Sequence, residues 1–152
     1  MLRSKRVGLG LGIGLLLGAC SVVAPARVLV EGKDWQLAVA RGPALEFREG
    51  SSTSGASSYT RPVTLNEASS FFTKGGTTLV AGPVTDEADK VVVTTGAGKA
   101  AAELADSHGY TWFWVELPGE QSVSDIVALD SSGAVVDEYT LPPMPGPPPS
   151  SD

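Results

Sequence analysis

The sequence predicts an all-β fold, an antiparallel sandwich of short strands. Apolar and polar residues alternate with a period of two at Trp35, Leu37 and Val39, and again at Leu45 and Phe47. Gly, Pro, Ser and Asp, the residues typical of tight turns, separate the apolar runs. The runs recur at the spacing expected of a β-sandwich, and such short connections do not suit parallel βαβ units.

The expected strands lie between residues 27 and 141. Ser51 to Ser58 contains no core-forming residue, so we expect a loop there. Ser131-Ser132-Gly133 predicts a hairpin turn with Gly133 in the left-handed region. The expected strands are residues 27–31, 35–40, 45–48, 77–81, 90–95, 110–117, 122–130 and 134–141.

Two further segments have competing interpretations. Lys99 to Asp106 has strong helix propensity, but both of its flanks resemble strands, and we expect a strand. Thr64 to Thr73 can form a short helix, because Thr64 and Glu67 fit a capping box.

Composition excludes several classes of function. The 152 residues suit one domain with extensions, and 42% hydrophobic residues are enough for a core. A single Cys and a single His exclude an internal disulfide and any site within this chain that needs two imidazoles. A net charge of −6 argues against a nucleic-acid partner. We expect no cofactor.

The first 19 residues have the layout of a secretory signal peptide. Arg3, Lys5 and Arg6 are followed by an uncharged apolar run that ends in small residues before Cys20. The alternative is an uncleaved transmembrane helix over residues 7–26, which is just long enough to span a bilayer. Repeated glycines, and polar or helix-breaking residues after position 20, disfavour that helix.

Leu17-Gly18-Ala19-Cys20 resembles the lipobox of bacterial lipoproteins. The resemblance implies recognition of Leu17, Gly18 and Ala19 by the lipoprotein signal peptidase and cleavage before Cys20. It also implies a diacylglyceryl group on the Cys20 thiol, with membrane lipid as partner and the extracytoplasmic face of the membrane as location. Removing three of the 11 cations leaves eight against 17 acidic residues, a charge near −9. Anionic headgroups repel such a domain, so the anchor is what holds it to the membrane.

The chain therefore divides into four parts: a signal peptide (1–19), a lipidated Cys with its spacer (20–26), a β-sandwich domain (27–141) and a tail (142–152). The tail holds six prolines, which cannot join a helix or sheet, and we expect a disordered, solvated end. The alternative is a ligand for a proline-reading groove.

Residues 79–141 resemble bacterial extracellular β-sandwich modules of the immunoglobulin-like or carboxypeptidase-regulatory-like kind. The resemblance lies in a Gly82-Pro83 turn, an aromatic strand that ends in Leu117-Pro118, and the Asp130 to Gly133 hairpin. It implies an immunoglobulin-like sandwich that serves as a binding or spacer module, and it transfers no catalytic residue.

Candidate chemistry is sparse. Asp106, Ser107 and His108 are adjacent, and adjacent side chains on an extended chain point apart, so we expect a loop histidine and no catalytic triad. Asp86, Glu87 and Asp89 are candidate Ca²⁺ ligands, but they lack EF-hand spacing, and we expect solvated turn carboxylates and no metal.

The aromatic strand offers the candidate binding surface. Tyr110, Trp112 and Trp114 share one face of the strand. Phe113, Val115 and Leu117 lie on the other face and form the better core set. The first face is either buried core or an exposed strip that binds a partner. On the second interpretation, replacing both tryptophans with alanine loses partner binding while the fold survives.

We therefore expect a non-catalytic binding or accessory module whose partner is an exported protein or a wall polymer. The competing class is a small extracellular hydrolase with carboxylate catalysis. That class requires convergent carboxylates in a pocket, one of them with a raised pKa.

Overall fold

A computed structural model describes residues 26–41 and 43–141. Apart from one short 3-10 helix, η1 (Leu65–Glu67), the regular elements of these residues are strands, which confirms the all-β prediction. Twelve strands form three antiparallel sheets of four strands each.

The N-terminal sheet is a simple meander of β1 (Arg27–Glu31), β2 (Trp35–Ala40), β3 (Ala44–Glu49) and β4 (Ser52–Ser58). The middle sheet has the order β5 (Ser69–Phe72), β6 (Thr77–Val84), β10 (Tyr110–Pro118), β9 (Glu103–Ser107). The C-terminal sheet has the order β12 (Val135–Thr140), β11 (Val123–Leu129), β7 (Lys90–Thr95), β8 (Gly98–Ala101).

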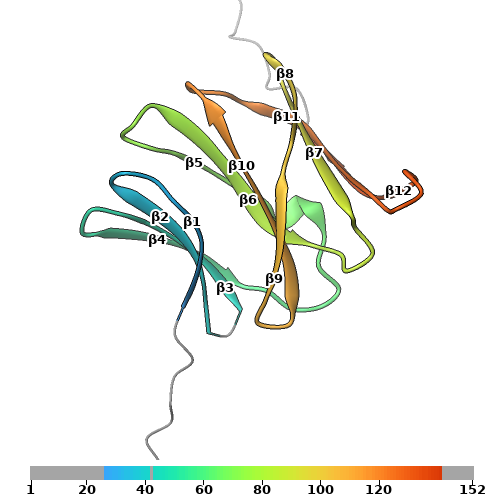
Figure 1. Cartoon of the computed structure of the whole chain (residues 1–152), viewed down its shortest axis with the longest axis horizontal. Coiled ribbons are helices and arrows are strands. Elements are labelled where there is room, and N and C mark those ends of the chain that lie inside the picture. The colour runs from blue at the N-terminus through green and yellow to red at the C-terminus, as the bar shows by residue number, and fades with distance from the viewer. Residues whose placement is uncertain (1–25, 42, 142–152) are drawn as a thin grey trace, which may run out of the picture.

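The middle and C-terminal sheets form an immunoglobulin-like sandwich. Their strand orders, β5-β6-β10-β9 and β12-β11-β7-β8, match the A-B-E-D and G-F-C-C′ orders of that fold. The predicted antiparallel sandwich is thereby confirmed. The N-terminal sheet is a third layer that strand alternation alone did not reveal, and Figure 1 shows it on the other side of the middle sheet.

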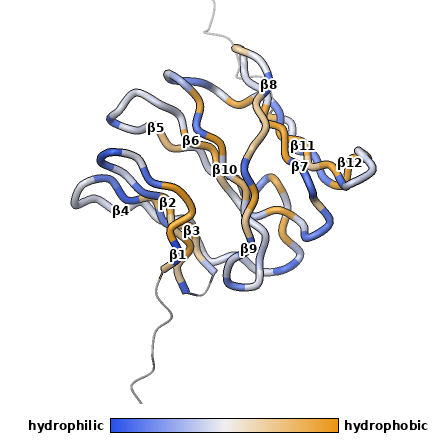
Figure 2. The backbone as a smooth tube through the Cα atoms, viewed as in Figure 1, coloured by the Kyte–Doolittle hydropathy of each residue, from blue (hydrophilic) through white to orange (hydrophobic). Residues whose placement is uncertain are grey.

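The middle sheet is buried on both faces. One face of β6 and β10 packs against the N-terminal sheet, with Leu79 and Trp112 in a cluster that includes Leu37. The other face packs against the C-terminal sheet through Val80 and Phe113. Because side chains alternate along a strand, β6 and β10 supply both cores. Figure 2 accordingly shows hydrophobic segments along β6 and β11 and hydrophilic ones at several turns.

The expected strand over residues 99–106 is confirmed, as two short strands with a break at Ala102. There the chain leaves the C-terminal sheet and joins the middle sheet, while the Ala102 N–H donates to the Val91 carbonyl at 2.9 Å. Thr64 begins a helix as expected, because Glu67 Oε2 accepts from the Thr64 N–H at 3.0 Å. That helix is only three residues long, and β5 follows it.

The loop expected at Ser51 to Ser58 was wrong, because Ser52–Ser58 is strand β4. β4 is an edge strand that pairs with β3 alone, in antiparallel register. An edge strand can be held by its main-chain hydrogen bonds without burying apolar side chains, so hydropathy gives no signal for it.

Trp112 is the residue on which the N-terminal interface most depends. It is fully buried, its ring meets Tyr59 edge-on at 5.5 Å between centroids, and its Nε1 donates to the Ser107 carbonyl at 2.9 Å. We expect Trp112→Ala to lower the free energy of unfolding by about 3–5 kcal/mol, because it leaves a cavity and removes the hydrogen bond from Nε1 to the Ser107 carbonyl.

Urea unfolding of the domain over residues 27–141 measures this loss. Phe72→Ala is the matched control, since that aromatic side chain is 56% exposed, and it should change stability by only about 0.5 kcal/mol. Equal midpoints for the two variants would contradict the assignment of Trp112 to the core.

Candidate functional site

The aromatic face of β10 is mainly core. Trp112 has no exposed surface, and Tyr110 and Trp114 are partly buried against the same cluster. Of the two interpretations of this face, the structure supports buried core for Trp112 and contradicts its candidacy for a binding surface, because the N-terminal sheet covers that face. Phe113, predicted to belong to the core, is fully buried on the opposite face.

The structure offers a different candidate, an open hollow of about 580 Å³ beside β9. Its polar lining includes Asp86, Asp89, Asp106 and Thr111. Tyr110, from the predicted aromatic set, also lines it. Three carboxylates from two separate segments thus face one open volume.

Two turns position these groups. The β6–β7 turn is closed by the Ala88 N–H, which donates to the Thr85 carbonyl at 3.0 Å, and is tied to β11 by the Asp89 N–H, which donates to the Leu129 carbonyl at 2.8 Å. The β9–β10 hairpin turns at His108 and Gly109, whose φ angles are +55° and +78°. Two consecutive positive φ angles are the mark of a type I′ turn, and His is one of the residues that tolerate this region.

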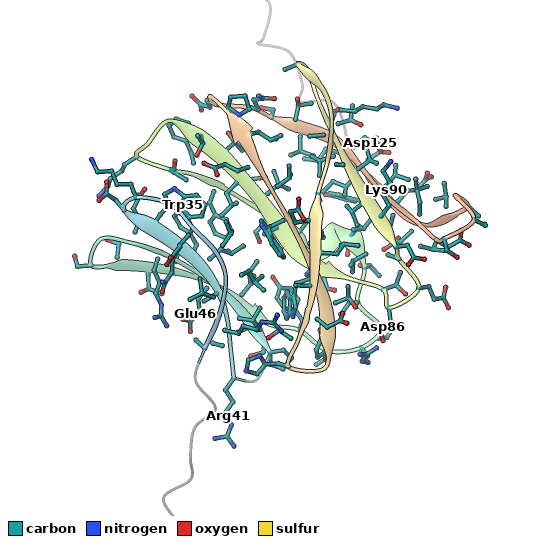
Figure 3. The ribbon with its side chains drawn as sticks, in the orientation of Figure 1. Trp35, Arg41, Glu46, Asp86, Lys90 and Asp125 are labelled. Atoms are coloured by element: carbon teal, nitrogen blue, oxygen red, sulfur yellow. The ribbon has the colours of Figure 1, made fainter. Side chains whose placement is uncertain are left out.

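Arg61 joins these turns to the segment before η1. One guanidinium nitrogen donates to Asp86 Oδ2 at 2.6 Å, the other donates to the Gly109 carbonyl, and the guanidinium carbon lies 4.9 Å from the centre of the Tyr110 ring. Figure 3 labels Asp86 in the same lower half of the view as Arg41. These polar contacts connect the β6–β7 turn to the β9–β10 turn at the rim of the hollow. Exposed ion pairs of this kind individually contribute little stability.

Thr111 links two of the carboxylates. Its Oγ1 donates to Asp106 Oδ1 at 2.8 Å and lies 3.4 Å from Asp86 Oδ1. The hydroxyl therefore fixes the orientation of Asp106, whose Oδ2 is left for other contacts, whereas Asp86 Oδ2 accepts from Arg61.

The Arg61 hydrogen bond lowers the pKa of Asp86 below its ordinary value. A group with a depressed pKa in the folded state stabilises the fold above its unfolded pKa, near 4, and loses that contribution as pH falls through the folded pKa. A general acid near neutral pH needs the opposite change, a raised pKa. Asp86 therefore stays ionised in its pair with Arg61 and is unsuited to protonating a leaving group.

The candidate Ca²⁺ ligands do not converge. Asp86 is directed to Arg61, and within residues 26–41 and 43–141 no group of three or more His, Cys, Asp or Glu side chains is placed to hold a metal ion. Asp86 and Asp89 line the hollow, whereas Glu87 lies with Arg61 on a neighbouring depression of the surface.

Ser107 and His108 do meet, because the turn at His108 brings Ser107 Oγ to 2.8 Å from His108 Nδ1. The expectation that these adjacent side chains point apart was wrong for that reason. Ser107 is only 7% exposed, so its hydroxyl is not presented to a substrate. The contact is a structural feature of the hairpin.

The N-terminal candidates, Leu17, Gly18, Ala19 and Cys20, lie outside the described residues, as does the tail 142–152. In the part of the chain that is described, no helix is long and apolar enough to cross a membrane.

Sequence reasoning missed Arg61, Thr111 and Asp106 as members of the site. Asp106 and Thr111 pair across the β9–β10 hairpin. Arg61 lies far away in the sequence, and only the folded sandwich brings it to this hairpin.

Comparison with known proteins identifies no relative of this chain. No protein-family model matches the chain, and no curated protein or solved structure matches it. The function is therefore argued from these residues and their chemistry.

Proposed function

We propose that the protein is a lipid-anchored binding module on the extracytoplasmic face of the cell membrane, without catalytic activity of its own. The observation that carries the proposal is the lipobox-like Leu17-Gly18-Ala19-Cys20, placed just before a β-sandwich. A diacylglyceryl group on Cys20, with a further acyl chain where one is added, supplies the chains that stable anchoring needs.

The binding surface of this proposal is the hollow beside β9. Asp89, Asp106, Thr111 and Tyr110 line it beside the Arg61–Asp86 ion pair, and two hydrogen-bonded turns hold them. Carboxylates form their strongest hydrogen bonds with cationic donors, so a partner with amino or guanidinium groups complements the site. An exported protein with a basic surface, or a wall polymer with free amines, has this chemistry.

The competing proposal, a carboxylate-dependent hydrolase, has less support from the geometry. It needs a carboxyl group with a raised pKa among those that line the hollow. The pKa of Asp86 is lowered by Arg61, and that carboxylate is engaged in an ion pair. We therefore prefer binding to hydrolysis.

The anchor is tested by the mass of the mature protein. We expect purified protein to begin at Cys20 and to carry the mass of a diacylglyceryl group, because the lipobox places both cleavage and lipid there. Cys20→Ala should lose the lipid and the cleavage before residue 20, whereas the neighbouring Ser21→Ala should keep both. A wild-type protein that retains residues 1–19 with an unmodified thiol would support the transmembrane helix instead.

The hollow is tested by site-specific photo-crosslinking on living cells. A crosslinking side chain at Asp89, on the hollow, should yield one reproducible adduct, and the same side chain at the exposed Lys99 of β8 should not. Asp106→Asn should reduce the adduct from position 89 severalfold, because it removes one of the charges that attract the partner. Equal adducts from both positions, unchanged by Asp106→Asn, would contradict this binding surface.

A further inference from the structure

The chain enters the fold beside the hollow. Arg27, the first residue of β1, donates through Nη1 to the main-chain carbonyl of Asp106 in β9. Figure 1 shows the chain arriving at the end of the molecule where β9 turns into β10. The segment that leads to Cys20 therefore joins the sandwich at the end that carries the hollow.

We propose that this end faces the bilayer, so that the hollow meets its partner close to the membrane surface. The inference rests on the proposed lipid anchor at Cys20. It adds an orientation, and it narrows the partner to a protein that is itself held at the membrane, in preference to a distant wall polymer.

The length of the tether supports this orientation. Arg27 follows Cys20 by seven residues, which span at most about 25 Å when fully extended. The middle sheet is about as long, since the eight steps from Tyr110 to Pro118 in β10 cover about 27 Å. The far end could rest on the bilayer only with the tether fully extended along the whole sheet, and full extension of a chain segment is entropically costly.

Strand register defines the two ends. Val84 pairs with Thr111, so the β6–β7 turn that carries Glu87 lies at the hollow end. Thr77 pairs with Pro118, and the Gly119 N–H donates to the Gly76 carbonyl at 3.0 Å. The β5–β6 turn that carries Lys74 therefore lies at the opposite end.

Two arginines at the hollow end reduce the repulsion that its carboxylates meet at an anionic membrane. Figure 3 shows Arg41 directed away from the strands at the end where the chain enters. In the described part of the chain, the ion pairs are Arg48–Glu46 and Arg61–Asp86, so neither Arg27 nor Arg41 belongs to one. Such cations are attracted to anionic lipid and offset part of the repulsion from the aspartates.

Energy transfer from two labelled positions tests the orientation. Lipidation consumes the thiol of the chain's single Cys, so Glu87→Cys and Lys74→Cys each provide one reactive thiol for a donor dye. Both residues are exposed. The full lipidated protein is inserted in vesicles of phosphatidylethanolamine and phosphatidylglycerol that carry an acceptor dye on the headgroups. We expect severalfold greater transfer from position 87 than from position 74.

Vesicle flotation separates the possible failures. Equal or reversed transfer from protein that floats with the vesicles would overturn the orientation and leave the anchor intact. Lipidated protein that does not float would overturn the anchor on which the inference rests.

A spacer variant tests whether the tether sets the orientation. Insertion of about 20 Gly/Ser residues between Ala24 and Pro25 adds a flexible coil longer than the original reach. We expect the difference between the two labels to shrink, because the domain can then rotate freely. An undiminished difference would contradict the tether as its cause.

Discussion

The structure depends on one constraint, that the middle sheet has two apolar faces and both must be covered. Trp112 and Leu79 project from one face, and Phe113 and Val80 project from the other. An immunoglobulin-like sandwich alone covers only the second face. Without a third layer, the first would expose a contiguous apolar patch of the kind that drives association or aggregation. The N-terminal sheet removes that patch.

The same covering sheet links the proposed anchor to the candidate site. It is the first sheet along the chain, and its first strand begins against β9 at Asp106. Because β9 and the adjoining β6–β7 turn form the hollow, β1 begins at the end of the molecule that carries the hollow. On the proposed anchoring at Cys20, the sheet that covers the core would then also set where the hollow stands relative to the membrane.

Local patterns were sufficient to predict most strands and the sandwich class. Alternation identified β2 and β3, and the Gly133 turn has the expected positive φ of +84°. Alternation could not distinguish an aromatic face that binds a partner from one covered by a third sheet, because both are apolar. β4 was missed because its main chain, not its side chains, holds it in place.

The hollow could not be predicted from sequence for a related reason. Arg61, Asp86 and Thr111 are separated by 25 residues at each step, and Asp86 meets Thr111 only after β6 and β10 have paired in the middle sheet. The acidic turn was visible in the sequence, but its partner cation was not. Long-range convergence of this kind leaves no local signal.

Hydrogen exchange of the domain without its proposed lipid anchor tests most directly whether both faces of the middle sheet must be covered. If the N-terminal sheet is an obligatory layer, the amides of β2 should open with the same free energy as those of β10, namely that of global unfolding. Edge strand β4 should exchange faster than either. If β2 instead exchanges through a separate opening of much lower free energy while β10 stays protected, the middle sheet does not need its N-terminal cover.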